Sequence, residues 1–356
     1  MPVWEEPVRG GFPDPALWTR TGLEQCEAFI ARVNSPAPPI HHLTGMRPTA
    51  VGPGTGTFTM PASPWLAGPT GHVLQGMLAV LADGPLGCAI QTTLPPATPY
   101  TTSELSMSYL RPVQADGGEL VCHGHVVHGG RSLALSEARV EDASGRLVAH
   151  ATSRCYLFPP APVTGRPPLP ELSARTYDDD PWMRPVLGAP TPPEVWRDRS
   201  GLEIVRGWIS GDLPAPPLHH LTGQMPIAGD EGTATFSMPA SGWLCSPAGT
   251  VEGGVLAMLA DAAIATAVQT TVPAGTAYAP ADVTVKFVRP VLPDDALLTA
   301  VGRVLHRGRT MAVATSEVRN AEGKLVVTAI GSALIMPGRD MTGPRVVVPD
   351  EDAVTE

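Results

Sequence analysis

The chain lacks a run of about 18 consecutive apolar residues, the length that a membrane-spanning helix requires. Its beginning also lacks the basic segment followed by an apolar segment that marks a secretory signal. We therefore expect no membrane span and, by default, a cytoplasmic location. With 356 residues, of which 43% are hydrophobic and 16% charged, the composition is that of a globular chain long enough for two domains.

An excess of positive charge is missing too, since the formal net charge is −10 at pH 7. Nucleic acid is not expected as the main partner, because neutralising phosphates requires a basic face. The five cysteines form no CxxC pair, so we expect small buried side chains rather than disulfides or a metal site. The absence of a GxSxG elbow and of a P-loop argues against serine hydrolases and nucleotide hydrolases.

What the chain does contain is an internal repeat with a constant offset of 178 residues. The matched segments are PPIHHLTG (38–45) with PPLHHLTG (216–223), TFTMPAS (57–63) with TFSMPAS (235–241), LAD (81–83) with LAD (259–261), QTT (91–93) with QTT (269–271) and RPV (111–113) with RPV (289–291). This period far exceeds the roughly 20–50 residues of solenoid repeats, so it indicates duplication of a whole folding unit.

These matches divide the chain into two domains. We predict a first domain at 1–158, a proline-rich linker at 159–195, a second domain at 196–340 and a C-terminal tail at 341–356. Prolines remove backbone N–H donors, so we expect the linker to be extended and partly ordered.

Each repeat is predicted to be an α+β domain. A short amphipathic helix opens it, with Thr21 or Ser200 as the N-cap and a glutamate three residues later. The almost wholly apolar segments 74–92 and 252–270 predict a helix that protein must surround on all sides. Alternating segments follow and predict antiparallel strands, so an antiparallel sheet should wrap around one central apolar helix.

This order of elements, with a glycine-led helix that carries one acid, resembles the hotdog fold and specifically the PaaI-type acyl-CoA thioesterases. The family pattern is roughly N-x-x-G-x-[VL]-H-G-G-x(4)-L-x-D, followed by a strand that opens with Ser or Thr and closes in Y/F-x-x-P. The second copy matches from Ser246 to Asp261, and the first from Gly68 to Asp83. The resemblance implies a tandem, double hotdog chain.

In this family the active site combines the helix-start glycine of one copy with the acid of the other, so the resemblance implies two composite sites. Site A joins Asp83 and Thr102 to Ser246, Glu252, Gly253 and Gly254. Site B joins Asp261 and Pro280 to Gly68, Leu74 and Gln75.

The two sites depart from the family pattern to different degrees. Site A has Ser246 for the usual Asn and Glu252 for the usual His. Site B has lost more, because Pro280 offers no hydroxyl and Gln75 crowds the helix start. We expect catalysis at site A, while site B is vestigial or binds an acyl chain without turnover.

The chemistry expected at site A follows from a helix start facing a carboxylate. Free N–H groups and a partial positive charge at Gly253 and Gly254 suit polarisation of a thioester carbonyl, with Gly253 as the donor. A carboxylate on so apolar a helix needs a reason. Asp83, or Asp261 in site B, would be the nucleophile or general base. The alternative is that each Asp accepts hydrogen bonds from a neighbouring loop and holds the two copies together.

The remaining candidates would bind or orient. Thr102 would orient water, and Ser246 and Glu252 would shape the pocket. Arg131 and Arg309 could meet the phosphates of coenzyme A, where guanidinium geometry suits phosphate, although solvated strand-end arginines are the more frequent case.

We predict a thioesterase that hydrolyses an acyl-CoA or related acyl thioester. It would use no metal or redox cofactor, with coenzyme A entering as part of the substrate, and two chains would form a homodimer. One alternative is a non-catalytic acyl-thioester or lipid-binding protein, which the departures at Ser246 and Glu252 favour. A hotdog enoyl hydratase or dehydratase is less favoured, because the helix carries no Asp/His pair.

Overall fold

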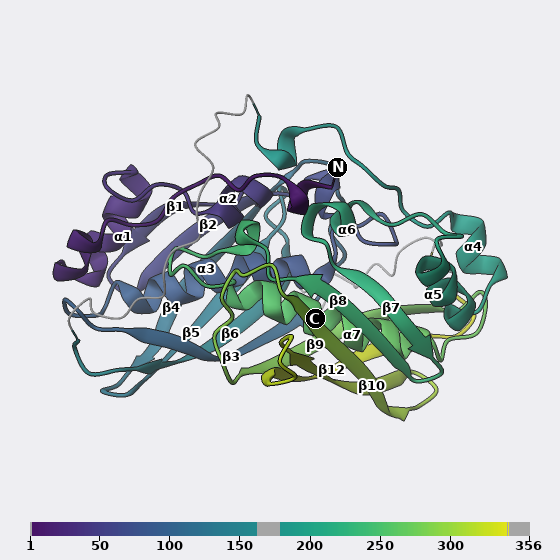
Figure 1. Ribbon diagram of the computed structural model, residues 1–356. Helices are drawn as coiled ribbons and strands as arrows, with labels where there is room; N and C mark the ends of the chain where they lie inside the picture. The colour runs from purple at the N-terminus through teal and green to yellow at the C-terminus, as the bar shows by residue number, and fades with distance from the viewer. Residues whose placement is uncertain (1, 162–178, 340, 342–356) are drawn as a thin grey trace.

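A computed structural model describes residues 2–161, 179–339 and 341. Each repeat forms an antiparallel sheet that curls around one long helix, and the two halves lie side by side (Figure 1). This is the α+β arrangement predicted for each copy. Residues 162–178 of the predicted linker and 342–356 of the predicted tail lie outside the described residues.

In the first repeat, two short helices precede the sheet and one long helix interrupts it. The helices are α1 (Gly22–Ala31), α2 (Pro39–Thr44) and α3 (Gln75–Gln91). The strands are β1 (Arg47–Gly52), β2 (Thr55–Pro61), β3 (Tyr100–Tyr109), β4 (Glu119–Gly129), β5 (Leu133–Glu141) and β6 (Leu147–Leu157). The long helix falls within the predicted apolar segment and continues through Pro85.

The second repeat has the same order of elements after an added short helix. The helices are α4 (Pro193–Asp198), α5 (Gly201–Ser210), α6 (Pro217–Thr222) and α7 (Gly253–Gln269). The strands are β7 (Met225–Asp230), β8 (Thr233–Pro239), β9 (Ala277–Phe287), β10 (Leu297–Arg307), β11 (Met311–Arg319) and β12 (Leu325–Met336). The predicted N-caps are confirmed, because Thr21 and Ser200 each form a capping box with the glutamate three residues later.

The strands of both repeats form one continuous twelve-stranded sheet, in the order β1-β2-β4-β5-β6-β3-β9-β12-β11-β10-β8-β7. The halves join where β3 pairs antiparallel with β9. Ser106 lies opposite Thr284 there, and their hydroxyl oxygens are 2.9 Å apart. Because these two positions are equivalent in the repeat, an approximate twofold axis passes between them.

The long helices α3 and α7 pack together inside the sheet at two equivalent close contacts. A Cβ added to Gly76 would lie 2.8 Å from the Cα of Met258, and one added to Gly254 would lie 2.6 Å from the Cα of Val80. Only glycine permits so close an approach of two backbones. The contacts bring the N-terminus of each helix against the middle of the other, which positions the candidate sites.

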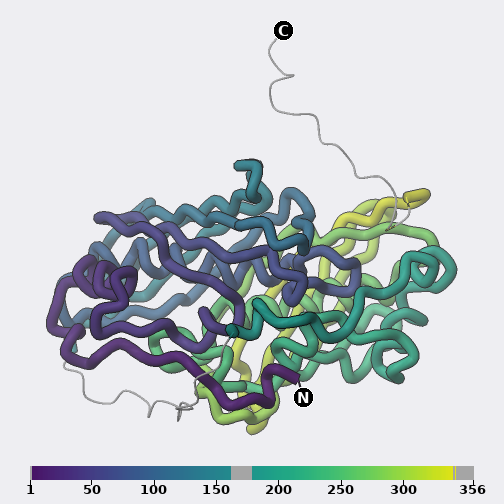
Figure 2. The backbone as a smooth tube through the Cα atoms, turned by 90° about the horizontal axis from the view of Figure 1, so that it is seen from above, coloured from purple at the N-terminus to yellow at the C-terminus, as the bar shows by residue number. Residues whose placement is uncertain are grey.

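A short segment at the start of the chain crosses to the second repeat. This N-terminal strap, residues 3–8, begins beside α6 (Figure 1), and Figure 2 shows the dark purple start of the chain running along the molecule. The indole N–H of Trp243 donates a hydrogen bond to the carbonyl of Glu6 at 2.9 Å. The hydroxyl of Ser241 donates to the carbonyl of Trp4 at 3.3 Å.

The equivalent segment of the second repeat crosses the other way. In this linker strap, residues 181–186, the carbonyl of Arg184 accepts the indole N–H of Trp65 at 2.9 Å. The two straps meet in an ion pair between Arg184 and Glu6, at 2.6 Å. Trp4 and Trp182 are themselves 178 residues apart, so residues placed in the predicted linker belong to the repeat.

The five cysteines are free thiols and all are buried, as predicted. Among the described residues, no helix combines the length and the apolar character needed to cross a membrane.

Candidate active site

The carboxylate of Asp83 lies against the start of α7, so α3 of the first repeat and α7 of the second share one site. The backbone N–H of Gly254 donates a hydrogen bond to Oδ2 of Asp83 at 3.0 Å. The same oxygen is 3.0 Å from the position that a Cβ on Gly253 would occupy. The structure thus brings together the acid and the two glycines expected in site A.

The surroundings of Asp83 set its ionisation. Burial raises the pKa of Asp83 to about 6, while the backbone N–H groups of Gly254 and Gly253 act in the opposite direction. At neutral pH the group is therefore a carboxylate with an unusually high proton affinity. That combination suits a general base, whose ideal pKa lies near the working pH.

Glu252 immediately precedes α7 and brings a second acid to site A. Its side chain is 5% exposed, and its Oε2 has no hydrogen-bond partner among the described residues. Burial, reinforced by the charge of Asp83, raises the pKa of Glu252 well above its usual value. Since only Asp83 receives peptide N–H groups, Asp83 carries the charge and Glu252 the proton.

Thr102 and Ser246 occupy different surroundings from those expected. Thr102, on β3, has its hydroxyl 3.8 Å from the thiol of Cys155. Burial, with a smaller contribution from the charge of Asp83, raises the pKa of that thiol to about 11. The hydroxyl oxygen of Ser246 instead accepts the N–H of Ala248 at 3.2 Å within its own turn.

Site B has a different construction around its acid. Asp261 is 3% exposed, and its Oδ2 accepts a hydrogen bond from the hydroxyl of Tyr109 at 3.3 Å. Its Oδ1 is buried without a hydrogen-bond partner among the described residues. Burial raises the pKa of Asp261 to about 7, against the lowering effect of Tyr109. A phenol thus occupies the place that peptide N–H groups hold in site A, although Gln75 does begin α3 as expected.

Two residues at these sites were not among the sequence candidates. Tyr109 closes β3 and reaches Asp261, while its equivalent Phe287 closes β9 and has its ring tip 3.5 Å from the Cβ position of Gly253. The signal was available, because these two residues align in the repeat and differ only by the hydroxyl. The acid of site B therefore has a phenol hydroxyl as hydrogen-bond donor, which the equivalent phenylalanine cannot supply in site A.

Arg131 and Arg309 lie at the surface of the molecule. Both are exposed, in the turns that join β4 to β5 and β10 to β11. Neither is brought into contact with Asp83 or Gly253 by any hydrogen bond or ion pair within the described residues. Binding of coenzyme A phosphates by these arginines stays a prediction.

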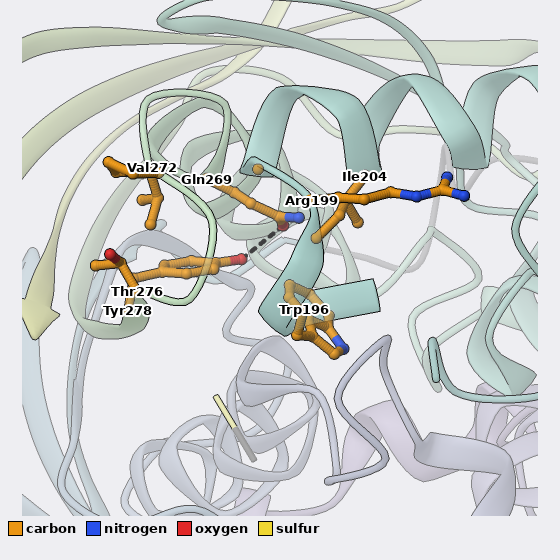
Figure 3. A pocket seen from close by; sticks show the side chains of 9 residues that line it. Trp196, Arg199, Ile204, Gln269, Val272, Thr276 and Tyr278 are labelled. Carbon is orange, nitrogen blue, oxygen red and sulfur yellow. Dashed lines mark hydrogen bonds between the residues drawn. The ribbon is translucent and has the colours of Figure 1, made fainter. Parts of the chain in front are cut away.

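A small cavity at the C-terminal end of α7 is too small to hold an acyl group. Trp196, Gln269 and Tyr278 line this space of about 10 Å³, and the hydroxyl of Tyr278 donates to Oε1 of Gln269 at 2.8 Å (Figure 3). Such a volume holds about one water molecule. We therefore place no substrate there.

The family model of the thioesterase superfamily matches the chain twice, at residues 70–149 and 248–327. The chain contains two thioesterase-superfamily domains. Each match includes the long helix and most of the sheet that follows it. The matches confirm the predicted family, its tandem organisation and the predicted class of thioester hydrolases. No curated protein matches the chain significantly.

Solved structures are similar to this chain to different degrees. A conserved protein with a hot dog fold from Alicyclobacillus acidocaldarius is 15% identical, with a TM-score of 0.50 over 83% of this chain and 97% of that one. An acyl-CoA thioesterase II from Mycobacterium marinum is 15% identical, with a TM-score of 0.49 over 86% and 99%. The PaaI protein of E. coli is 29% identical, with a TM-score of 0.32 over 34% and 85%. The first of these supports the double hotdog architecture.

Proposed function

We propose that the chain hydrolyses an acyl-CoA or a related acyl thioester at site A, between the two repeats. The observation that carries this proposal is the contact between the Asp83 carboxylate and the Gly254 N–H, which places a buried base at a helix start. We place the thioester carbonyl near the N-terminus of α7, where the positive end of the helix dipole would stabilise the negative charge that develops on its oxygen during attack.

In the proposed reaction Asp83 accepts a proton from water while the water oxygen bonds to the thioester carbon. The carbonyl electron pair moves onto oxygen and forms a tetrahedral oxyanion. When the oxyanion collapses, the carbon–sulfur bond breaks, and the thiolate leaves with its electron pair and receives the proton from Asp83. The products are a carboxylic acid and a free thiol. The N–H groups of Gly253 and Gly254 keep Asp83 ionised before it accepts the proton.

Replacing Asp83 with Asn tests this function. We expect Asp83→Asn to lose about 10²–10⁴-fold in kcat, since it removes the base and retains the shape. The matched variant is Asp261→Asn in site B, which should retain most of the turnover because Asp261 faces a tyrosine hydroxyl. The measurement is steady-state release of free CoA from a panel of acyl-CoAs. If wild type binds acyl-CoA without releasing CoA, the chain is a binding protein; hydration of an enoyl-CoA would show a hydratase instead.

The pH profile provides an independent prediction. Protonation of Asp83 below its pKa of about 6 removes the base, so kcat/KM should fall by about tenfold per pH unit below that value. The carboxylate is regained as pH rises, so kcat/KM should level off above neutral pH. The profile should be measured for wild type and Asp261→Asn, which should share the acid limb. If the fall in kcat/KM at low pH disappeared in Asp261→Asn, the reaction would have to be assigned to site B.

Two broader features complete the proposal. A cytoplasmic location agrees with the absence of a spanning helix among the described residues. We also propose a homodimer, because exposed apolar side chains, among them Ile330 and Leu334 of β12 and Tyr156 of β6, offer a surface for a second chain.

A further inference from the structure

The N-terminus of α7 has few N–H groups left for a substrate. The N–H groups of Gly253 and Gly254 both act on the Asp83 carboxylate. The N–H of Glu252 itself donates to the carbonyl of Leu244 at 3.0 Å, and that of Val255 donates to the carbonyl of Glu252 at 3.1 Å. These are the four N–H groups that have no i→i−4 partner at the helix start, and each already has an acceptor. A thioester carbonyl in site A therefore needs another hydrogen-bond donor.

The side chain of Glu252, at the N-terminus of α7, has a polar atom that makes no hydrogen bond with the described residues. It directly precedes Gly253, is almost completely buried, and makes no capping hydrogen bond to its own helix. Its Oε2 has no partner among the described residues. A buried polar atom without a partner costs free energy, and a ligand that completes the hydrogen bond recovers it.

We propose that Glu252 is a neutral carboxylic acid whose O–H donates a hydrogen bond to the thioester carbonyl oxygen. This inference rests on the proposed hydrolysis at site A and assigns Glu252 a catalytic role in it. The proton stays on Glu252, because the neighbouring Asp83 already carries the negative charge of the pair and receives the peptide N–H groups. As the oxyanion forms, the O–H···O bond strengthens without a net transfer of the proton.

The division of labour between the two acids follows from their partners. Asp83 accepts hydrogen bonds from peptide N–H groups, which stabilise its ionised form. The ionised carboxylate can then act as the base. Glu252 has no donor within reach among the described residues, so its carboxyl group can serve as a donor only in the protonated form. One negative charge and one proton are thus shared between two acids in a single buried site.

Three variants of the full-length chain test the proposal by CoA release. Glu252→Gln keeps an N–H donor of the same shape, and we expect kcat within about tenfold of wild type. Glu252→Leu removes the donor, and we expect kcat to fall by about 10²–10³-fold with a smaller change in KM. The exposed Glu231→Gln should leave kcat unchanged. Thermal unfolding of each variant shows whether it has folded.

Infrared spectroscopy supplies a readout independent of turnover. Wild type at neutral pH should show the carbonyl stretch of a protonated carboxyl group that Glu252→Gln lacks. Equal losses in Glu252→Gln and Glu252→Leu, wild-type kcat in a folded Glu252→Leu, or no such carbonyl stretch would each overturn the proposal while hydrolysis stands. A wild-type chain that releases no CoA overturns the proposed function itself, which is a different result.

Discussion

Replacing Gly254 with valine is expected to abolish CoA release and to lower the free energy of unfolding by at least about 3 kcal/mol. A Cβ at this position would lie 2.6 Å from both the carbonyl oxygen of Ala79 and the Cα of Val80. These are backbone atoms of a buried helix, so they cannot turn aside as a flexible side chain can. The two helices must separate, and Asp83 then loses the N–H that holds it.

The measurements are urea-induced unfolding and steady-state CoA release. Gly129→Val is the matched control, because Gly129 is exposed at the end of β4 and an added Cβ there meets nothing within 4 Å. The control should keep both stability and turnover. A Gly254→Val chain as stable as wild type would show that the helices can move apart without cost.

A chain divided between its repeats is expected to remain assembled and active. When residues 1–161 and 179–356 are co-expressed as separate polypeptides, they should co-purify and release CoA. The β3–β9 pairing, the packing of α3 on α7 and the two exchanged straps all join the halves without the linker. Each half expressed alone should aggregate, because it exposes a strand edge and an apolar helix surface.

Size-exclusion chromatography of the co-expressed halves measures this assembly. Deleting residues 2–9 from the first half provides the comparison, because it removes the N-terminal strap that contacts Trp243 and should weaken the association. Two halves that elute separately as folded monomers would show that the linker, rather than the packing, holds the repeats together.

Much of the fold could be predicted from the sequence because its signals are local or periodic. The constant offset indicated two equal folding units, and the apolar segments 74–92 and 252–270 located both long helices to within a residue. The capping boxes at Thr21 and Ser200 depend on residues three positions apart. Such patterns can be recognised without knowing how distant parts of the chain pack.

The site was harder to predict because it depends on contacts between the halves. The composite pairing of Asp83 with the start of α7 came from the family resemblance, since the sequence does not show how the repeats pack. The hydrogen bond from Tyr109 to Asp261 spans the interface and has no local signature. Prolines in residues 181–186 suggested a linker. The offset of 178 residues between Trp4 and Trp182 instead identifies this segment as the second strap, which crosses between the repeats.

The pairing of Ser106 with Thr284 shows that the axis between the halves is only approximate. In a symmetric dimer of single-repeat chains, every mutation appears in both copies. A helix start therefore cannot change at one site and stay the same at the other. A fused gene removes that restriction. Tyr109 and Phe287 could then diverge, and one of the two composite sites could lose its activity while the other kept it.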